Sequence, residues 1–233
     1  MPVIVNDVLE QAEGLAKALD NHKDQITSKG NGQKRIDDLN STQQDLIKAN
    51  SSQVAAETFM QQKTSEKSDA IQAAKDAVAL VDEAAKSAFE GDKTTLKEFR
   101  IGVAKPKSEE GWVTFLDYMT GPVQKHRDDL IANGLTPDDI ANVSTVYANL
   151  VAAIAVQKNA AKVRNAATKS RDSAVSALST KITATRNFAK VALKDDKGAL
   201  EEIKPIKTGG RKTSKPAPPA PPAPEPPQTA PQK

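Results

Sequence analysis

The chain of 233 residues is 38% hydrophobic and only 3% aromatic, and its formal net charge is +3. It contains no cysteine, which excludes disulfide bonds, thiolate metal sites and cysteine nucleophiles. Alanine is the commonest apolar residue. Because an alanine side chain buries little area, this composition favours long helices packed in thin layers over a thick globular core.

Proline spacing predicts that the first half of the chain is built from long helices. After Pro2 the next proline is Pro106, and proline breaks helix interiors. The Gly-Asn-Gly turn at residues 30–32 tolerates positive φ and divides this span. We therefore expect one helix over residues 6–28 and a second over residues 33–90.

Apolar residues recur at three- and four-residue spacing along both predicted helices. Asn6 is a candidate N-cap for the first of them. The second is nearly all polar over residues 61–69, which predicts a thinly packed or bent stretch. Gly91 ends this helix and Asp92 begins a short third one, predicted over residues 92–101.

A fourth helix is predicted over residues 109–132, after a loop that contains Pro106. Gly121 and Pro122 should kink or restart it, and Gly134 ends it. This helix carries the densest aromatic cluster of the chain: Trp112, Phe115, Leu116, Tyr118 and Met119. The cluster is either the hydrophobic plug that holds the neighbouring helices together or an exposed face that binds a partner or a lipid surface. On the second interpretation, Trp112, Phe115 and Tyr118 are partner-binding candidates.

The strongest helix start in the sequence is Thr136-Pro137-Asp138-Asp139. Threonine caps the helix, proline occupies its first position, and the two acids face the positive end of the helix dipole. The helix then runs without proline or glycine to about Asp196, about 60 residues or about 90 Å. Its alanine-rich middle allows a neighbouring helix to approach closely.

The two helices of about 60 residues have matching lengths, so we predict that they pair as an antiparallel backbone. The shorter helices then pack beside them, one set at each end, and the middle is thinner. The predicted fold is all-α: an elongated antiparallel helical bundle over residues 1–203.

Residues 204–233 are predicted to form a disordered tail that is basic and rich in proline. Gly198 and Pro205 should end the ordered part. Lys215, Pro218 and Pro221 fit the spacing of a PxxP ligand, although a plain spacer is the alternative. Lys212 and its basic neighbours could make weak contacts with anionic surfaces. No aromatic residue lies among them, which argues against sequence-specific nucleic-acid binding.

No constellation of residues points to catalysis, a cofactor or a metal. His22 and His126 each lack a second ligating motif elsewhere, and HExxH is absent. We expect both histidines to be ordinary surface or boundary residues; the alternative is a pH-sensitive contact. An enzyme would need a site built from Lys, Asp and Glu alone.

The segment from Arg186 to Ile203, RNFAKVALKDDKGALEEI, resembles the closing segment of uncharacterised bacterial long-helix bundle proteins. The resemblance covers residues 135–212. It implies a helical rod, without an activity and without functional residues.

Two functions are compatible with these observations. The first is a non-catalytic structural or protein-interaction rod that binds a protein partner or itself. The second is a membrane-active or surface-coating protein, either like a pore-forming toxin or associated with granules, that uses residues 143–156 or the aromatic cluster. Fourteen mixed residues are too few to span a bilayer, so we predict no transmembrane segment. The N-terminus has no basic region or long apolar run, which predicts a cytoplasmic protein without a signal peptide.

Overall fold

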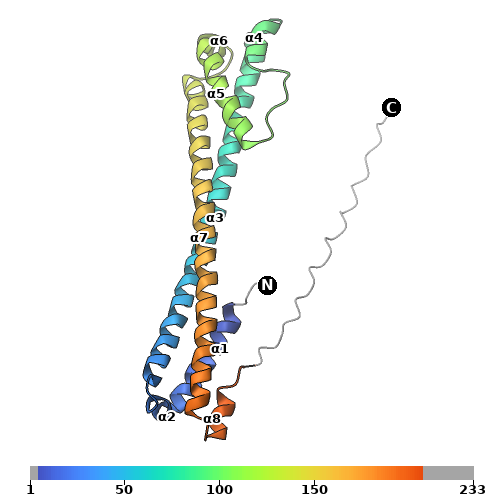
Figure 1. Ribbon diagram of the computed structural model, residues 1–233. Coiled ribbons are helices and arrows are strands. Elements are labelled where there is room, and N and C mark those ends of the chain that lie inside the picture. Colours follow the sequence, from blue (N-terminus) through green and yellow to red (C-terminus); the bar gives the residue numbers. More distant parts are fainter. Residues whose placement is uncertain (1–4, 207–233) are drawn as a thin grey trace, which may run out of the picture.

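The computed structural model describes residues 5–206, and these residues form helices and connecting loops without a strand. Figure 1 shows an elongated bundle built on two long antiparallel helices, which confirms the predicted fold class. The predictions for the tail, including Lys212, Lys215, Pro218 and Pro221, lie outside the described residues. The helices are α1 Val5–Asn21, α2 Lys23–Thr27, α3 Gly32–Ala88, α4 Lys93–Glu98, α5 Glu109–Lys125, α6 Arg127–Ala132, α7 Pro137–Ala192 and α8 Lys197–Glu202.

The long helices α3 and α7 contain 57 and 56 residues and so are each about 85 Å long. A capping box starts α7, as predicted: the Asp139 backbone N–H donates to the Thr136 hydroxyl over 3.1 Å, and the Thr136 backbone N–H donates to the Asp139 carboxylate over 2.8 Å. The two helices run side by side, and Lys181 of α7 donates to Asp38 of α3 over 3.1 Å.

Two separate buried clusters hold the molecule together, one at each end. The first combines the C-terminal half of α3 with α5, α6 and the N-terminal half of α7. The second combines helices α1, α2 and α8 with the N-terminal half of α3 and the C-terminal half of α7. Residues 47–69 of α3 and 155–173 of α7 belong to neither cluster, and we call this stretch the waist. Figure 1 shows α3 and α7 alone there, as the polar sequence at residues 61–69 predicted.

Three predicted boundaries are wrong. The first helix does not continue to Ser28, because it breaks at His22 (φ −115°) and α2 starts one residue later. The fourth helix runs through Pro122 and breaks instead at His126 (φ −107°). Gly198 does not end the ordered part, because it lies inside α8.

Other ends differ by a few residues. The last long helix ends at Ala192 rather than near Asp196, and the short third helix ends at Glu98 rather than at Ile101. Asn6 lies inside α1, which begins at Val5, and so is not the first residue before a helix.

The second half of the chain repeats the helical plan of the first, 104 positions later. Helices α1 and α5 have 17 residues each, and both end at a histidine, His22 or His126, that precedes a very short helix. Helices α4 and α8 have six residues each, and an aspartate caps both, Asp92 and Asp196. The glycines that follow α2 and α6, Gly30 and Gly134, both have positive φ.

Because α3 and α7 are antiparallel neighbours, the two halves are related by an approximate two-fold rotation whose axis crosses the waist. Ala56 and Ala160 are equivalent under this rotation and both are buried at the waist, where their small side chains allow the long helices to approach. Other equivalent pairs fill equivalent core positions in the two clusters: Ile26 with Leu130, Leu39 with Val143, Leu46 with Leu150, and Ala85 with Ala189.

Candidate functional site

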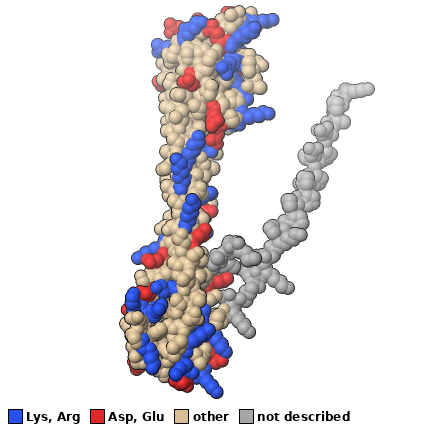
Figure 2. Space-filling view, viewed as in Figure 1, with Lys and Arg blue, Asp and Glu red and all other residues tan. Residues whose placement is uncertain are grey.

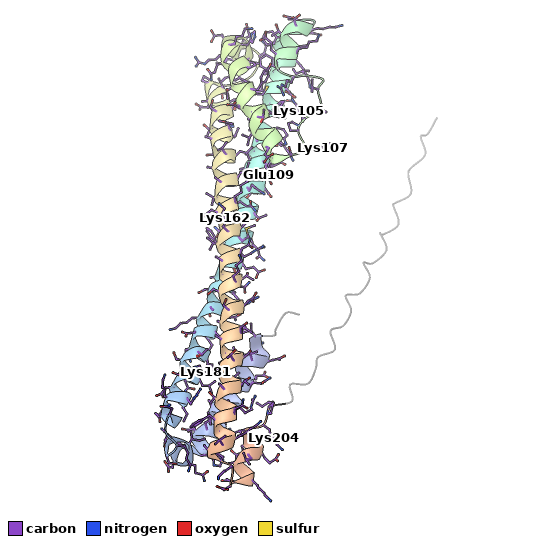
Figure 3. The ribbon with its side chains drawn as sticks, in the orientation of Figure 1. Lys105, Lys107, Glu109, Lys162, Lys181 and Lys204 are labelled. Carbon is purple, nitrogen blue, oxygen red and sulfur yellow. The ribbon has the colours of Figure 1, made fainter. Side chains whose placement is uncertain are left out.

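The aromatic residues of α5 divide between core and surface. Trp112 and Phe115 are 5% and 2% exposed, and their rings meet edge to face with centroids 5.7 Å apart. Lys105 lies in the loop before α5 (Figure 3). Its ammonium nitrogen is 4.7 Å from the centroid of the Phe115 ring and donates to Asp82 over 3.0 Å. Trp112 and Phe115 are therefore core side chains, and they do not form an exposed face.

Tyr118 is the exposed member of the aromatic cluster, at 40%. The Arg100 guanidinium lies 4.2 Å from its ring centroid, a cation–π contact. Arg100 follows α4 and is the one described non-glycine residue with positive φ, at 53°. The exposed ring thus has a partner within the chain, which fixes the loop after α4 on α5.

The two ends of the molecule are the better candidate site, because each end has the same construction. We call them the α4 tip (α4, α6, the C-terminal end of α3 and the N-terminal end of α7) and the α8 tip (α8, α2, the N-terminal end of α3 and the C-terminal end of α7). Figure 2 shows that both ends are wider than the waist and carry side chains of both charges.

At the α4 tip, His126 joins two helices. Its Nε2 lies 3.0 Å from the Glu98 carboxylate, and its ring packs against Phe89 and Phe99, with centroids 5.0 and 5.6 Å away. Lys125 donates to the same carboxylate over 2.9 Å. The hydrogen bonds from Lys125 and then His126 hold the pKa of Glu98 below its ordinary value.

The α8 tip repeats this junction with His22 and Glu202, which are the equivalents of His126 and Glu98. The His22 Nε2 lies 3.4 Å from the Glu202 carboxylate without hydrogen-bond geometry, and the Asn21 side chain donates to that carboxylate over 3.0 Å. The pKa of Asp196 is lowered, chiefly by the hydrogen bond from the Ala199 backbone N–H. The two histidines are therefore helix-junction residues, each paired with a glutamate from the short helix at its tip.

Charged surface residues are the second feature that the tips share. Three charged pairs that are identical between the halves are exposed in both copies: Asp24 with Asp128, Lys86 with Lys190, and Lys93 with Lys197. At a fourth pair of equivalent exposed positions, Lys23 and Arg127 differ in residue type but are both positively charged. Within residues 5–206 none of these side chains has an ion-pair partner.

Other charged positions differ between the halves, at the tips as well as along the long helices: the exposed Lys97 of α4 is equivalent to the exposed Glu201 of α8. Lys34 is equivalent to Asp138, and Asp82 is equivalent to Arg186, so the sign of the charge is reversed. Helices α1 and α5 have no identical residue at equivalent positions. The tips thus share four equivalent exposed charges, although other charged positions differ between them.

In the described part of the chain no group of three or more His, Asp or Glu residues could hold a metal ion. One described helix, α7, is long and apolar enough to cross a membrane by length and composition, and 28% of its most apolar 18-residue window is buried.

Comparison with known proteins finds no match among family models, curated proteins or solved structures.

Proposed function

We propose that the chain is a non-catalytic helical scaffold that binds the same kind of protein partner at each of its two tips. The observation that carries this proposal is a set of equivalent, exposed charged side chains at the tips that make no ion pair within residues 5–206: Lys86, Lys93, Arg127 and Asp128 at one tip, and Lys190, Lys197, Lys23 and Asp24 at the other. A mixture of three cations and one anion suits a protein surface better than a polyanion, which would be repelled by the aspartate.

The long helices suit a spacer. Helices α3 and α7 each run from one tip to the other, so the two tips are about 85 Å apart. Two copies of one partner would be held at this separation, one at each tip, as two independent sites. Localisation in the cytoplasm stays a prediction from the sequence.

The proposal is tested by reversing charge at one tip at a time. Lys86→Glu, Lys93→Glu and Arg127→Glu alter the α4 tip, and the equivalent substitutions at Lys190, Lys197 and Lys23 alter the α8 tip. A control carries three reversals in the waist, at the exposed residues Lys158, Lys162 and Lys169. Affinity capture from the producing cells, with quantitative mass spectrometry, then measures the partner recovered per chain.

We expect each single-tip variant to recover about half as much of one partner as the control, because one equivalent site of two remains. The variant altered at both tips should lose that partner. If the variant altered at both tips recovers every partner in the same amount as the control, the tips do not bind partners and the proposal fails.

A membrane-active role is the second candidate, and one observation favours it. Residues 140–157 of α7 contain no Asp, Glu, Lys or Arg over a length of about 27 Å, close to the thickness of a bilayer core. The equivalent stretch of α3 carries Asp37, Asp38, Asp45 and Lys48. Co-sedimentation with vesicles tests this role. Wild-type chain should bind, and Ala148→Lys with Ala152→Lys, at exposed positions, should abolish binding; recovery of the wild-type chain in the supernatant alone would exclude it.

A further inference from the structure

The waist carries large apolar side chains that are exposed within residues 5–206. Phe59 is 39% exposed, Val156 is 44% exposed and Val163 is 45% exposed. Of the helices in the described part of the chain, α3 and α7 alone run through this region, and none of the others buries these side chains. Two helices alone bury one narrow seam, whereas three or four helices enclose a core.

These three side chains lie on one face of the helix pair. Val156 and Val163 are seven residues apart and so project from the same side of α7. Phe59 is the equivalent of Val163, and a two-fold axis perpendicular to two side-by-side helices keeps equivalent residues on the same face. The contact between Gln157 and the Met60 sulfur, at 4.0 Å, places Phe59 at the level of Val156.

This face points away from the short helices. Glu109 and Glu110, at the start of α5, line one surface depression together with Ile154 and Lys158 of α7. Ile154 and Lys158 each lie two positions from Val156, about 200° around the helix. The start of α5 therefore lies on the opposite side of α7 from Val156, and the approximate two-fold places α1 on that same opposite side.

The face extends along α7 without a charge. Ala152, Val156, Val163 and Ala167 follow one another at spacings of four and seven residues, and Ala55 precedes Phe59 on α3 by four. On α3 the nearest charge, Lys63, lies 5.4 Å above the Phe59 ring and is paired with Glu66 over 2.7 Å. The α7 part of the face is uncharged, as one side of a four-helix core is, whereas the α3 part carries Glu66, seven residues from Phe59, in an ion pair with Lys63.

We propose that the waist face binds the waist face of a second copy of this chain, so that two helix pairs form a four-helix bundle at the centre of a dimer. A partner must match a surface that has its own two-fold symmetry, and a second copy does so. The waist is about 20 residues or about 30 Å long, and a helix pair is about 20 Å wide. The dimer would bury about 600 Å² per copy, at the low end for specific interfaces.

The test measures the oligomeric state of the full chain by light scattering and sedimentation velocity over a concentration series. We expect wild-type chain to be dimeric. Val156→Glu with Val163→Glu should weaken the dimer about 100-fold or more, because four carboxylates would be brought together in its core. Circular dichroism checks that the variant keeps its helices, as expected for substitutions at exposed positions.

The matched control is Val54→Glu with Val151→Glu, at positions that are 55% and 41% exposed. Val54 is the equivalent of Lys158, and Val151 is seven residues from Lys158, so both lie on the side of the short helices. This control should remain dimeric. A chain with Val156→Lys and Val163→Lys should be monomeric alone and should form a mixed dimer with the Glu variant.

Three results would overturn the proposal: a monomeric wild-type chain at every concentration, equal loss of dimer in the control, or no mixed dimer between the Glu and Lys chains. Wild-type chain that is monomeric in buffer but binds vesicles through Val156 and Val163 would assign the face to lipid instead. None of these results bears on partner binding at the tips, which a monomer would still allow.

Discussion

The two buried clusters share no residue, and we predict that they unfold as separate cooperative units. Leu130 and Ile26 occupy equivalent positions in the two clusters and both are 0% exposed. Replacing either with alanine leaves a cavity that costs about 2–5 kcal/mol. Trp112, the one tryptophan of the chain, lies in the cluster of Leu130 and reports on that cluster alone.

The waist sets the strength of coupling between the clusters. Its buried residues are Gln53, Ala56 and Ala160. Burying an alanine methyl group contributes about 0.8 kcal/mol, so the two alanines together contribute less than the cavity at Leu130 or Ile26 is expected to cost. A cavity in one cluster should therefore destabilise that cluster before it destabilises the other.

Thermal unfolding followed by tryptophan fluorescence and far-ultraviolet circular dichroism tests this expectation. Leu130→Ala should lower the fluorescence midpoint by about 10 °C or more, since about 1 kcal/mol shifts a unit of this size by 4–8 °C. Ile26→Ala should leave the fluorescence midpoint within about 2 °C of wild type, while circular dichroism shows an earlier partial transition. Equal shifts of both signals in both variants would show one cooperative unit and refute the reasoning.

Three further predictions concern the ends of the helices and of the chain. Thr136→Ala should lower the free energy of unfolding by about 1 kcal/mol in a urea titration, because it removes the N-cap of α7; an unchanged midpoint would contradict the cap. The pKa of Glu98 is lowered in the folded state, mainly by Lys125, so its contribution is present above the ordinary carboxyl pKa and is lost as the pH falls through the folded value. Glu98→Gln should therefore be less stable than wild type at pH 7, with a difference that begins to shrink as the pH falls below the ordinary carboxyl pKa of about 4.3 and is lost below the lowered folded value; a difference that grows on acidification would refute the pairing. Truncation after Ile206 should leave ellipticity and melting temperature nearly unchanged, because both buried clusters lie before it; a fall of several degrees would contradict this.

The long helices were predictable because helix breakers are few and their positions are informative. The capping signal predicted the first residue of α7 correctly, because Thr136 followed by a proline and two acids is a specific helix-start pattern. The positions of the helix breakers predicted matching lengths for α3 and α7, and those matching lengths led to their predicted pairing. These are local signals, and each is carried by a short stretch of sequence.

The break at His126 was not predictable from such signals. Proline usually ends a helix, yet α5 continues through Pro122 because Met119 and Val123, on either side of it, are buried at 1% and 0% exposure. Tertiary packing thus outweighs the hydrogen bond that Pro122 lacks. The break comes instead where His126 pairs with Glu98, a contact between residues that are 28 positions apart.

The repeat escaped the sequence prediction because most equivalent positions differ. Its clearest signal is short: Asp92-Lys93, Leu96 and Glu98 recur with the same spacing as Asp196-Lys197, Leu200 and Glu202. A search for self-similarity at long spacing would have found it. Its structural consequence, a two-fold relation between antiparallel helices, requires the pairing of α3 with α7.

In this short repeated segment some residues have a role in the fold, and the lysine pair is exposed. Asp92 and Asp196 cap helices α4 and α8, and Glu98 and Glu202 lie beside the junction histidines. Lys93 and Lys197 are exposed and make no ion pair within residues 5–206, so no contact recorded there explains why both halves carry lysine. A partner that contacts both tips would account for it. The charge-reversal experiment is therefore most informative at this pair. Lys93→Glu and Lys197→Glu should leave the melting temperature unchanged, and each should weaken partner recovery. A loss of stability would instead show that both lysines have a role in the fold.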